Sequence, residues 1–297
     1  MINFDNMTTE QQNPNTLNLD QMSYQEALMV MNEEDMRVAL AIKEVLPQIE
    51  LAIQQIVAAF EVGARLIYIG AGTSGRLGIL DAAECPPTFG TPKEMVVGLI
   101  AGGEDALIDA IEGAEDSREM GKDDLKKIQL TSKDVVVGLA ASGRTPYVIG
   151  GLEYANQIGA ETVAIACNEH SEVGKIANIA IEVVTGPEVV TGSTRLKAGS
   201  AQKMVLNMLS TLSMVGIGKV YRNLMVDVQR TNEKLEIRSE NIVMTATDVS
   251  RSVAKEQLKK SKGNVKLAIT MILLDCDLET AEHKLKVANG HIRKTLN

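Results

Sequence analysis

The chain is poor in the residues that bind metals or form disulfide bonds. Among its 297 residues are three cysteines and three histidines, which lie far apart and form no Cys-x-x-Cys pair. This scatter argues against a disulfide framework and against a structural zinc site, and it suits a reducing compartment. We therefore expect neither a metal nor another cofactor.

Basic residues and long apolar segments are also in deficit. Lys and Arg number 30 against 39 Asp and Glu, which gives a net charge of −9. The resulting field repels nucleic acid and anionic membrane surfaces. The apolar runs are too short to span a bilayer, and the first twenty residues lack the basic and apolar regions of a signal peptide. We expect a cytoplasmic protein with no nucleic-acid partner and no membrane partner.

What the chain does have is a series of short β-rich runs. They alternate with stretches of helical length and lie at residues 65–70, 95–100, 134–140, 161–166 and 179–184. Such alternation is typical of an α/β fold with a parallel sheet. Residues 24–62 have helical spacing that is split at Pro47, and residues 199–242 predict one further helical stretch packed on the sheet.

The same pattern divides the chain into three parts. Residues 1–23 form a polar N-terminal arm, and residues 24–247 contain the predicted sheet with its flanking helices. Residues 248–297 are different in character, since they break into three short helical pieces with Ser or Asp at their starts. We expect a small helical C-terminal domain.

The apolar residues of 24–62 and 199–217 exceed what one five-stranded sheet can cover, which predicts a homodimer.

A glycine-rich loop follows the first predicted strand in the segment GAGTSGRLGILDAAECPPTF, residues 70–89. Glycines let the main chain approach an anion, and hydroxyl groups and helix N–H groups can bind one. Ser74-Gly75-Arg76 is echoed after the third strand by Ser142-Gly143-Arg144-Thr145. Because loops at the carboxyl ends of parallel strands share one edge, the two turns can hold one phosphate, or their serines can simply cap helices.

The loop also fits the G-x-G-x-x-G pattern of dinucleotide-binding proteins. That reading expects an acidic residue at the end of the second strand, about 20 residues further on. Here the second strand ends in Ala101-Gly102-Gly103. A sugar phosphate is therefore favoured over a nicotinamide cofactor.

Two acidic residues stand out from the many on the chain. Glu84 is expected at the end of the helix that follows the first loop, next to Pro86 and Pro87. Glu115 lies in the segment EGAEDS and is less distinctive by sequence alone. A third loop, at residues 191–195, precedes Lys197 and Lys203, either of which can contact an anion or lie on a solvated face.

With these motifs in hand, the chain resembles the N-acetylmuramic acid 6-phosphate etherases, bacterial enzymes of the sugar isomerase (SIS) fold. The resemblance covers nearly the whole chain: TTEQQNP, GAGTSGRLGILDAAECPPTF, EGAEDS, GLAASGRTPYV, TGSTRLKAGSAQKMVLNMLST and VDVQRTNEKLEIRS. Gln12 departs from it, because many relatives are expected to have a basic residue there. The resemblance implies a five-stranded parallel sheet flanked by helices, with a small C-terminal helical domain.

The resemblance also implies roles for individual residues. Glu84 takes the position of the proton donor, and Glu115 that of a second catalytic acid. The substrate-binding positions are Gly72, Thr73, Ser74, Gly75, Ser142, Gly143, Arg144 and Thr145. The partners implied are a small sugar phosphate and a second copy of the chain.

The implied reaction belongs to the breakdown and recycling of cell-wall amino sugars. It releases D-lactate from the ether at C3 of N-acetylmuramic acid 6-phosphate and leaves N-acetylglucosamine 6-phosphate. Two alternatives stay open. The related glucokinase regulatory proteins share the GTSGR loop and bind fructose phosphates without catalysis, and a sugar-phosphate isomerase would also use a glutamate base. Acidic residues at both positions, 84 and 115, favour the etherase.

Overall fold

The structure is a computed structural model that describes residues 7–109, 111–228 and 233–296. It divides into two compact units. The first comprises Met1–Ala83 with Glu94–Ser210, and the second comprises Glu84–Lys93 with Thr211–Asn297.

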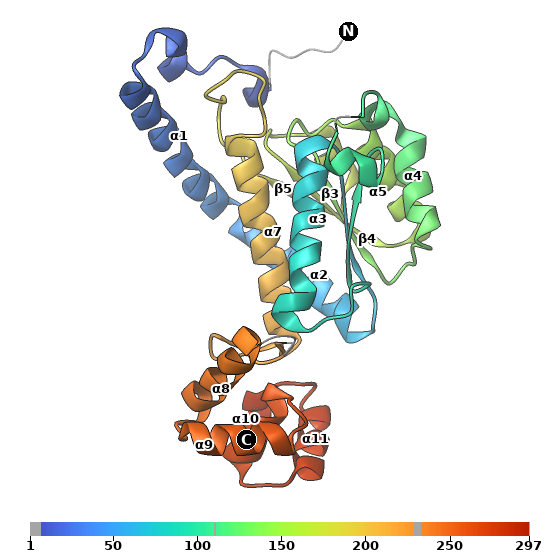
Figure 1. Cartoon of the computed structure of the whole chain (residues 1–297). Coiled ribbons are helices and arrows are strands. Elements are labelled where there is room, and N and C mark those ends of the chain that lie inside the picture. The colour runs from blue at the N-terminus through green and yellow to red at the C-terminus, as the bar shows by residue number, and fades with distance from the viewer. Residues whose placement is uncertain (1–6, 110, 229–232, 297) are drawn as a thin grey trace. The chain divides into compact units, whose positions relative to one another are not determined.

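A five-stranded parallel sheet forms the centre of the first unit (Figure 1). Its strands are β1 (Leu66–Gly70), β2 (Val96–Ile100), β3 (Val135–Leu139), β4 (Glu161–Ala166) and β5 (Ile179–Glu182). They lie in the order β2-β1-β3-β4-β5, and Leu66 of β1 pairs with Val96 on one side and Val135 on the other. This confirms the predicted α/β fold and its five strand runs.

Helices connect the strands and precede them. In the first unit these are α1 (Tyr24–Glu44), α2 (Leu46–Glu61), α3 (Gly72–Phe89), α4 (Arg118–Lys127), α5 (Pro146–Ile158), α6 (Glu172–Ile176) and α7 (Lys197–Gly216), of which α3 and α7 continue into the second unit. Short 3-10 helices are η1 (Thr8–Glu10), η2 (Pro14–Thr16), η3 (Leu19–Gln21), η4 (Glu104–Leu107) and η5 (Ala114–Asp116). Pro47 separates α1 from α2, as predicted, because proline is favoured in the first turn of a helix, where the N–H that it lacks would have no partner within the helix.

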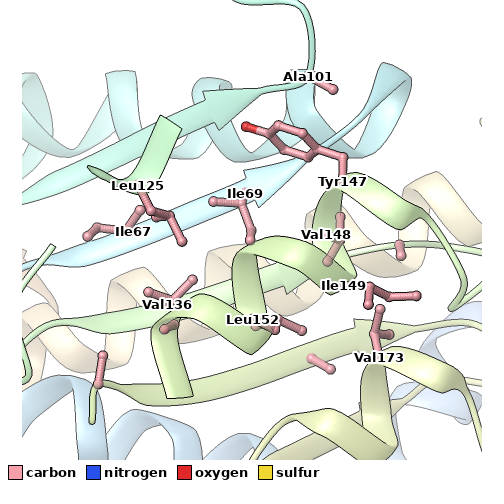
Figure 2. Close-up of a cluster of buried hydrophobic side chains, with 14 of the residues drawn as sticks. Ile67, Ile69, Ala101, Leu125, Val136, Tyr147, Val148, Ile149, Leu152 and Val173 are labelled. Atoms are coloured by element: carbon pink, nitrogen blue, oxygen red, sulfur yellow. The ribbon is translucent and has the colours of Figure 1, made fainter. Parts of the chain in front are cut away.

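One hydrophobic cluster fills the space between the sheet and the helices α4 and α5 (Figure 2). Ile67 and Ile69 of β1 and Val136 of β3 pack there against Tyr147 and Leu152 of α5, and all five side chains are buried. Every residue of β1 and of β3 is buried, as expected of central strands covered on both faces. The loops at the carboxyl ends of these strands therefore stand on a closely packed base.

The helix that follows the first loop is longer than the sequence predicts. We expected it to end at Glu84, but α3 continues through Pro86 and Pro87 to Phe89. Both prolines fall near the end of the helix, and the N–H of Gly90 then donates to the carbonyl of Pro86. That prediction was wrong because a proline removes its own N–H without preventing the remaining residues from keeping helical dihedrals.

The prediction of one helical stretch over residues 199–242 was also wrong. The helix α7 ends at Gly216, and Gly218 has a φ of 77°, a left-handed value that stops a helix. Two short antiparallel strands follow, β6 (Val220–Tyr221) and β7 (Leu224–Met225). Residues 229–232 lie outside the described residues, and α8 (Glu233–Thr247) follows them.

The C-terminal part contains the three predicted short helices. These are α9 (Arg251–Lys260), α10 (Val265–Leu274) and α11 (Leu278–Val287), followed by one turn, α12 (Ile292–Thr295). The side chains of Ser250, Asn264 and Asp277 cap the three N-termini. These helices belong to the second compact unit together with residues from 211 onward. The domain boundary after residue 247 stays a prediction.

Candidate active site

The first glycine-rich loop turns directly from β1 into the first turn of α3. Gly75 is buried there, and a Cβ atom added to it would lie 2.5 Å from the side chain of Ile100 and 2.7 Å from the carbonyl oxygen of Gly70. Only glycine fits this close approach of helix and strand. Ser74 is also buried, and its hydroxyl donates to Oε1 of Gln202 at 2.8 Å. Gly72 is exposed and Thr73 half-buried, so these two remain open to a ligand.

The second loop, residues 140–145, turns from β3 into α5. Gly143 has a φ of 78°, and a Cβ atom there would lie 2.4 Å from Cβ of Ser171, so no other residue fits. Thr145 is the N-cap of α5, yet its side chain makes no capping hydrogen bond. The positive end of a helix of 13 residues therefore lies beside the half-buried side chains of Ser142 and Thr145. This arrangement favours an anion.

Glu115 lies between the two loops. It is exposed on η5 and lines two cavities. One, of about 220 Å³, is bounded by Gly72 of the first loop, and the other, of about 410 Å³, by Ser142 and Thr145 of the second. The structure thus brings the less distinctive of the two predicted acids together with both predicted anion loops.

Glu84 is placed differently. It is exposed on α3, twelve residues after Gly72, which is about three helical turns along the same helix. Among the described residues that line the two cavities next to Glu115, Glu84 is absent. The role of Glu84 stays a prediction.

The N-terminal arm reaches the site, which the sequence analysis raised only through Gln12. Met7 and Glu10 line the larger cavity, and Nη1 of Arg144 lies 3.6 Å from the sulfur of Met7. The guanidinium of Arg144 is also 3.2 Å from Glu172. Gln12 itself is exposed and does not line this cavity. The arm residue that brings a charge to the site is Glu10.

Asn168 is a buried residue of the site that the sequence analysis missed. Its Nδ2 donates to the hydroxyl of Thr9 at 3.0 Å and to the carbonyl of Ser142 at 3.2 Å, and its Oδ1 accepts from Thr8 at 2.9 Å. Asn168 therefore ties the arm to the second loop. A signal was available, since Asn168 follows the strand predicted at 161–166 and so lies at the carboxyl edge of the sheet.

Arg76 and Arg144 are not equivalent, although both follow a Ser-Gly pair. Arg76 donates from Nε to the carbonyl of Leu107 at 2.9 Å and from a terminal nitrogen to the carbonyl of Asp109 at 3.4 Å. Arg144 instead faces the side chains of Met7 and Glu172. We expected two equivalent Ser-Gly-Arg turns to bind one phosphate. The contacts of the two arginines fit that expectation better for the second turn than for the first.

A buried carboxyl group lies on α3 behind the first loop. Burial raises the pKa of Asp81 to about 6, although hydrogen bonds from the hydroxyls of Tyr68 and Ser210, each at 2.9 Å, act in the opposite direction. Asp81 thus joins β1, α3 and α7 in the interior. Its side chain is only 9% exposed, so it supports the structure and does not meet a ligand.

Among the described residues, His, Cys, Asp and Glu form no group of three or more that could hold a metal ion. None of the described helices combines the length and apolar character that crossing a membrane requires.

Known proteins resemble this chain over its whole length. An N-acetylmuramic acid 6-phosphate etherase from Geobacillus sp. (strain WCH70) is 61% identical over 290 residues, which cover 98% of both chains. One from Bacillus cereus (strain AH187) is 59% identical over 292 residues, covering 98% of this chain and 99% of the relative. The chain belongs to the N-acetylmuramic acid 6-phosphate etherase family.

Matches to domain families and solved structures agree with the SIS fold. Residues 48–156 match the glucokinase regulatory protein N-terminal SIS domain, and residues 119–212 match the SIS domain. A phosphoheptose isomerase from Neisseria gonorrhoeae has a TM-score of 0.50 at 14% identity, covering 64% of this chain and 98% of that chain. One from Francisella tularensis has the same TM-score at 15% identity, covering 65% and 98%. At these identities the structures speak for the fold alone.

Proposed function

We propose that this member of the etherase family cleaves the lactyl ether of N-acetylmuramic acid 6-phosphate, giving N-acetylglucosamine 6-phosphate and D-lactate. The observation that carries the proposal is that relatives about 60% identical over 98% of the chain are named N-acetylmuramic acid 6-phosphate etherase. The position of Glu115 between two anion-binding loops supports it, because the reaction needs a carboxyl group near a bound phosphosugar.

The chemistry of this reaction explains how carboxyl groups can catalyse it. Opening the sugar ring gives an aldehyde at C1, which makes the proton at C2 acidic. A carboxylate removes that proton, the C3–O bond breaks, and the lactate oxygen takes a proton from a carboxylic acid. Water then adds across the resulting C2–C3 double bond, with the hydroxyl at C3 and a proton at C2. Each positioned acid or base contributes about 10²–10⁴-fold to the rate.

The described residues suggest how the substrate is held. The 6-phosphate would bind at the N-terminus of α5, where Ser142 and Thr145 present hydroxyl groups, with Arg144 adding positive charge. Thr73 and the main chain at Gly72 would contact it from the first loop. Glu115 would then act on the sugar carbons as one of the two acids, and Glu84 would supply the other.

The phosphate binds away from the bonds that change. Its binding energy can therefore hold the open-chain sugar in register for reaction at C2 and C3.

Incubation of the purified protein with N-acetylmuramic acid 6-phosphate, followed by an assay for D-lactate, tests the proposal against both alternatives. The etherase releases one lactate per substrate. A regulator binds the substrate and releases none, and an isomerase converts the sugar without releasing lactate. The Glu115→Gln variant is the matched control, since it keeps the anion loops and loses a reacting carboxyl group.

We also propose that the chain forms a homodimer. The helix α1 buries only Glu34, Val38 and Ile42, while large apolar side chains on it are exposed: Tyr24 by 92%, Leu28 by 66%, Met29 by 57%, Met36 by 60% and Leu40 by 66%. Such a stripe suits a self-complementary partner, and a second copy would cover it symmetrically.

Sedimentation equilibrium tests the homodimer directly. We expect a species of twice the 32.0 kDa chain mass, with activity falling on dilution, because the neighbouring copy would complete the rim of the site. Leu28→Glu together with Leu40→Glu should shift the equilibrium to the single chain. A single chain that stays fully active at every concentration would overturn the proposal.

We also propose that the protein is cytoplasmic. Its three cysteines lie far apart in the sequence and form no Cys-x-x-Cys pair, and two of them, Cys85 and Cys167, are buried, as suits a reducing compartment. A phosphorylated sugar is also a substrate that cells hold inside their membranes. Detection of the protein in the soluble cytoplasmic fraction of its cells tests this placement.

A further inference from the structure

We propose that Arg76 is a positioning residue that fixes the segment carrying Glu115, and that it does not bind the substrate phosphate. The inference rests on the proposed function, since it assigns Glu115 to the reaction. It also distinguishes the two Ser-Gly-Arg turns, which look alike in the sequence. The arginine of the first turn fixes a loop, and that of the second turn helps to bind an anion.

The contacts of Arg76 are directed at a loop backbone. Arg76 is the fifth residue of α3 and is half-buried. Its Nε donates to the carbonyl of Leu107 at 2.9 Å, and Nη2 reaches the carbonyl of Asp109 at 3.4 Å. A guanidinium group is planar and rigid, with its N–H donors in a fixed arrangement. Hydrogen bonds from it to two carbonyl groups of one segment therefore fix the position and the orientation of that segment.

The segment from Glu104 to Asp116 needs such an anchor. It leads from the edge strand β2 to α4, and its described residues form the short helices η4 and η5 and connecting turns. Among its described residues, the backbone hydrogen bonds outside those helices stay local, as between Asp109 and Asp105 or Asp116 and Gly113. Ile108 is 88% exposed, and of the segment's described residues only the small side chains of Ala106 and Ala114 are buried. Arg76 supplies the hydrogen bonds that tie this segment to the sheet-and-helix core.

Arg76 and Glu115 line the same cavity of about 220 Å³. Gly72 and Ala71 also line it from the first loop, while Glu112 and Gly113 precede Glu115 along the segment. The Arg76 bonds therefore set where Glu115 lies relative to the first loop. Misplacement of a reacting group by about 1 Å can cost on the order of 10²-fold in rate.

The two possible roles of Arg76 predict opposite kinetics. If Arg76 positions Glu115, its loss lowers kcat and leaves substrate binding nearly intact, because the second loop still holds the phosphate. If Arg76 binds the phosphate, its loss raises KM and weakens inhibition by inorganic phosphate. Arg144 provides the matched control, because it has the same local sequence but lines the cavity beside Ser142 and Thr145.

The experiment compares Arg76→Gln, Arg76→Lys and Arg144→Gln in the full-length protein. We expect Arg76→Gln to lower kcat by about 10²-fold with KM and the inhibition constant for inorganic phosphate unchanged. Arg76→Lys, which keeps a donor, should recover part of kcat. Arg144→Gln should raise KM and the phosphate inhibition constant. A rise of both constants in Arg76→Gln with kcat preserved would overturn the assignment, as would a variant with wild-type kinetics.

Amide hydrogen exchange tests the anchor without any activity. Exchange in residues 104–116 should rise in Arg76→Gln relative to wild type, while exchange in the strands β1 and β3 stays the same. Unchanged exchange in that segment would overturn the inference even if kcat fell. If the wild-type protein released no lactate, the proposed function would fail, and the exchange measurement would still decide whether Arg76 anchors the segment.

Discussion

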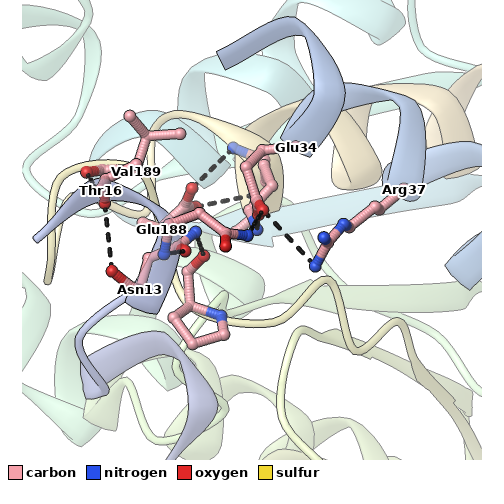
Figure 3. A network of polar contacts seen from close by, with 10 residues as sticks. Asn13, Thr16, Glu34, Arg37, Glu188 and Val189 are labelled. Carbon is pink, nitrogen blue, oxygen red and sulfur yellow. Dashed lines mark hydrogen bonds and ion pairs between the residues drawn. The ribbon is translucent and has the colours of Figure 1, made fainter. Parts of the chain in front are cut away.

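The ammonium group of Lys197 lies 2.5 Å from Oε2 of Glu34, with side chains only 1% and 2% exposed (Figure 3). The pair joins α1 to the first turn of α7. Asn15 donates to the other oxygen of Glu34 at 2.9 Å, and Glu188, itself buried, accepts the N–H groups of Lys197 and Ala198. Lys197 therefore neither meets an anionic ligand nor lies on a solvated face.

Removing one partner of this pair should destabilise the protein strongly. Lys197→Met leaves a buried carboxylate without its cation, which costs about 3–5 kcal/mol in the free energy of unfolding. The double variant Glu34→Met with Lys197→Met should recover most of that loss, because it leaves no uncompensated charge. Urea unfolding measures both. As a control, Lys260→Gln breaks an exposed pair with Glu256 and should cost less than about 1 kcal/mol. Equal losses of unfolding free energy in Lys197→Met and Lys260→Gln would contradict this account.

Asp81 should make stability depend on pH. Its folded-state pKa of about 6 is above the ordinary 3.8, so the folded protein holds this proton more tightly than the unfolded chain does. Its stabilising contribution is therefore complete below about pH 4 and is lost as the pH rises to about 6. The difference in unfolding free energy between wild type and Asp81→Asn should fall over that interval and stay constant above it. A difference independent of pH would show that Asp81 titrates normally.

Ser142→Ala should act on binding rather than on turnover. The change deletes one hydrogen bond to a charged phosphate oxygen, which corresponds to roughly 1.5–3 kcal/mol. We expect KM for the phosphosugar and the inhibition constant for inorganic phosphate to rise together, with kcat nearly constant. Ser250→Ala, which removes the cap of α9, serves as a control because Ser250 lines neither cavity next to Glu115. Inorganic phosphate that fails to compete with substrate would refute the phosphate assignment.

Glu115→Gln should abolish nearly all lactate release, since the amide can neither accept nor donate the required proton. The loss should reach about 10²–10⁴-fold in kcat, while inhibition by inorganic phosphate persists. Glu119→Gln, on the exposed side of α4, should retain wild-type activity. Glu84→Gln should show a loss comparable to that of Glu115→Gln. If one variant still exchanges the C2 proton with deuterium from solvent, the other glutamate is the base. Near wild-type turnover in Glu84→Gln would reduce Glu84 to a structural residue.

The sheet was predictable because its strands are buried on both faces and so read as continuous apolar runs, as in Val135–Leu139. The positions of the first and second loops could then be predicted, because both loops follow the carboxyl ends of strands. The hairpin at Val220–Met225 was not predictable, because its apolar residues continue the helical spacing of α7 and only Gly218 marks the stop. The roles of Asn168 and of the arm were hidden for another reason. Thr9 and Asn168 are 159 residues apart, and only tertiary packing brings them together.

The measurement that tests the central claim most directly is the reaction of N-acetylmuramic acid 6-phosphate in water enriched in oxygen-18, with mass analysis of the lactate. Elimination breaks the bond between C3 of the sugar and the ether oxygen, so the lactate keeps that oxygen. The account predicts one unlabelled lactate for each molecule of N-acetylglucosamine 6-phosphate formed. Labelled lactate would mean that water attacks the lactyl carbon, and absence of lactate would mean that the chain does not act as an etherase. Either result would contradict the account.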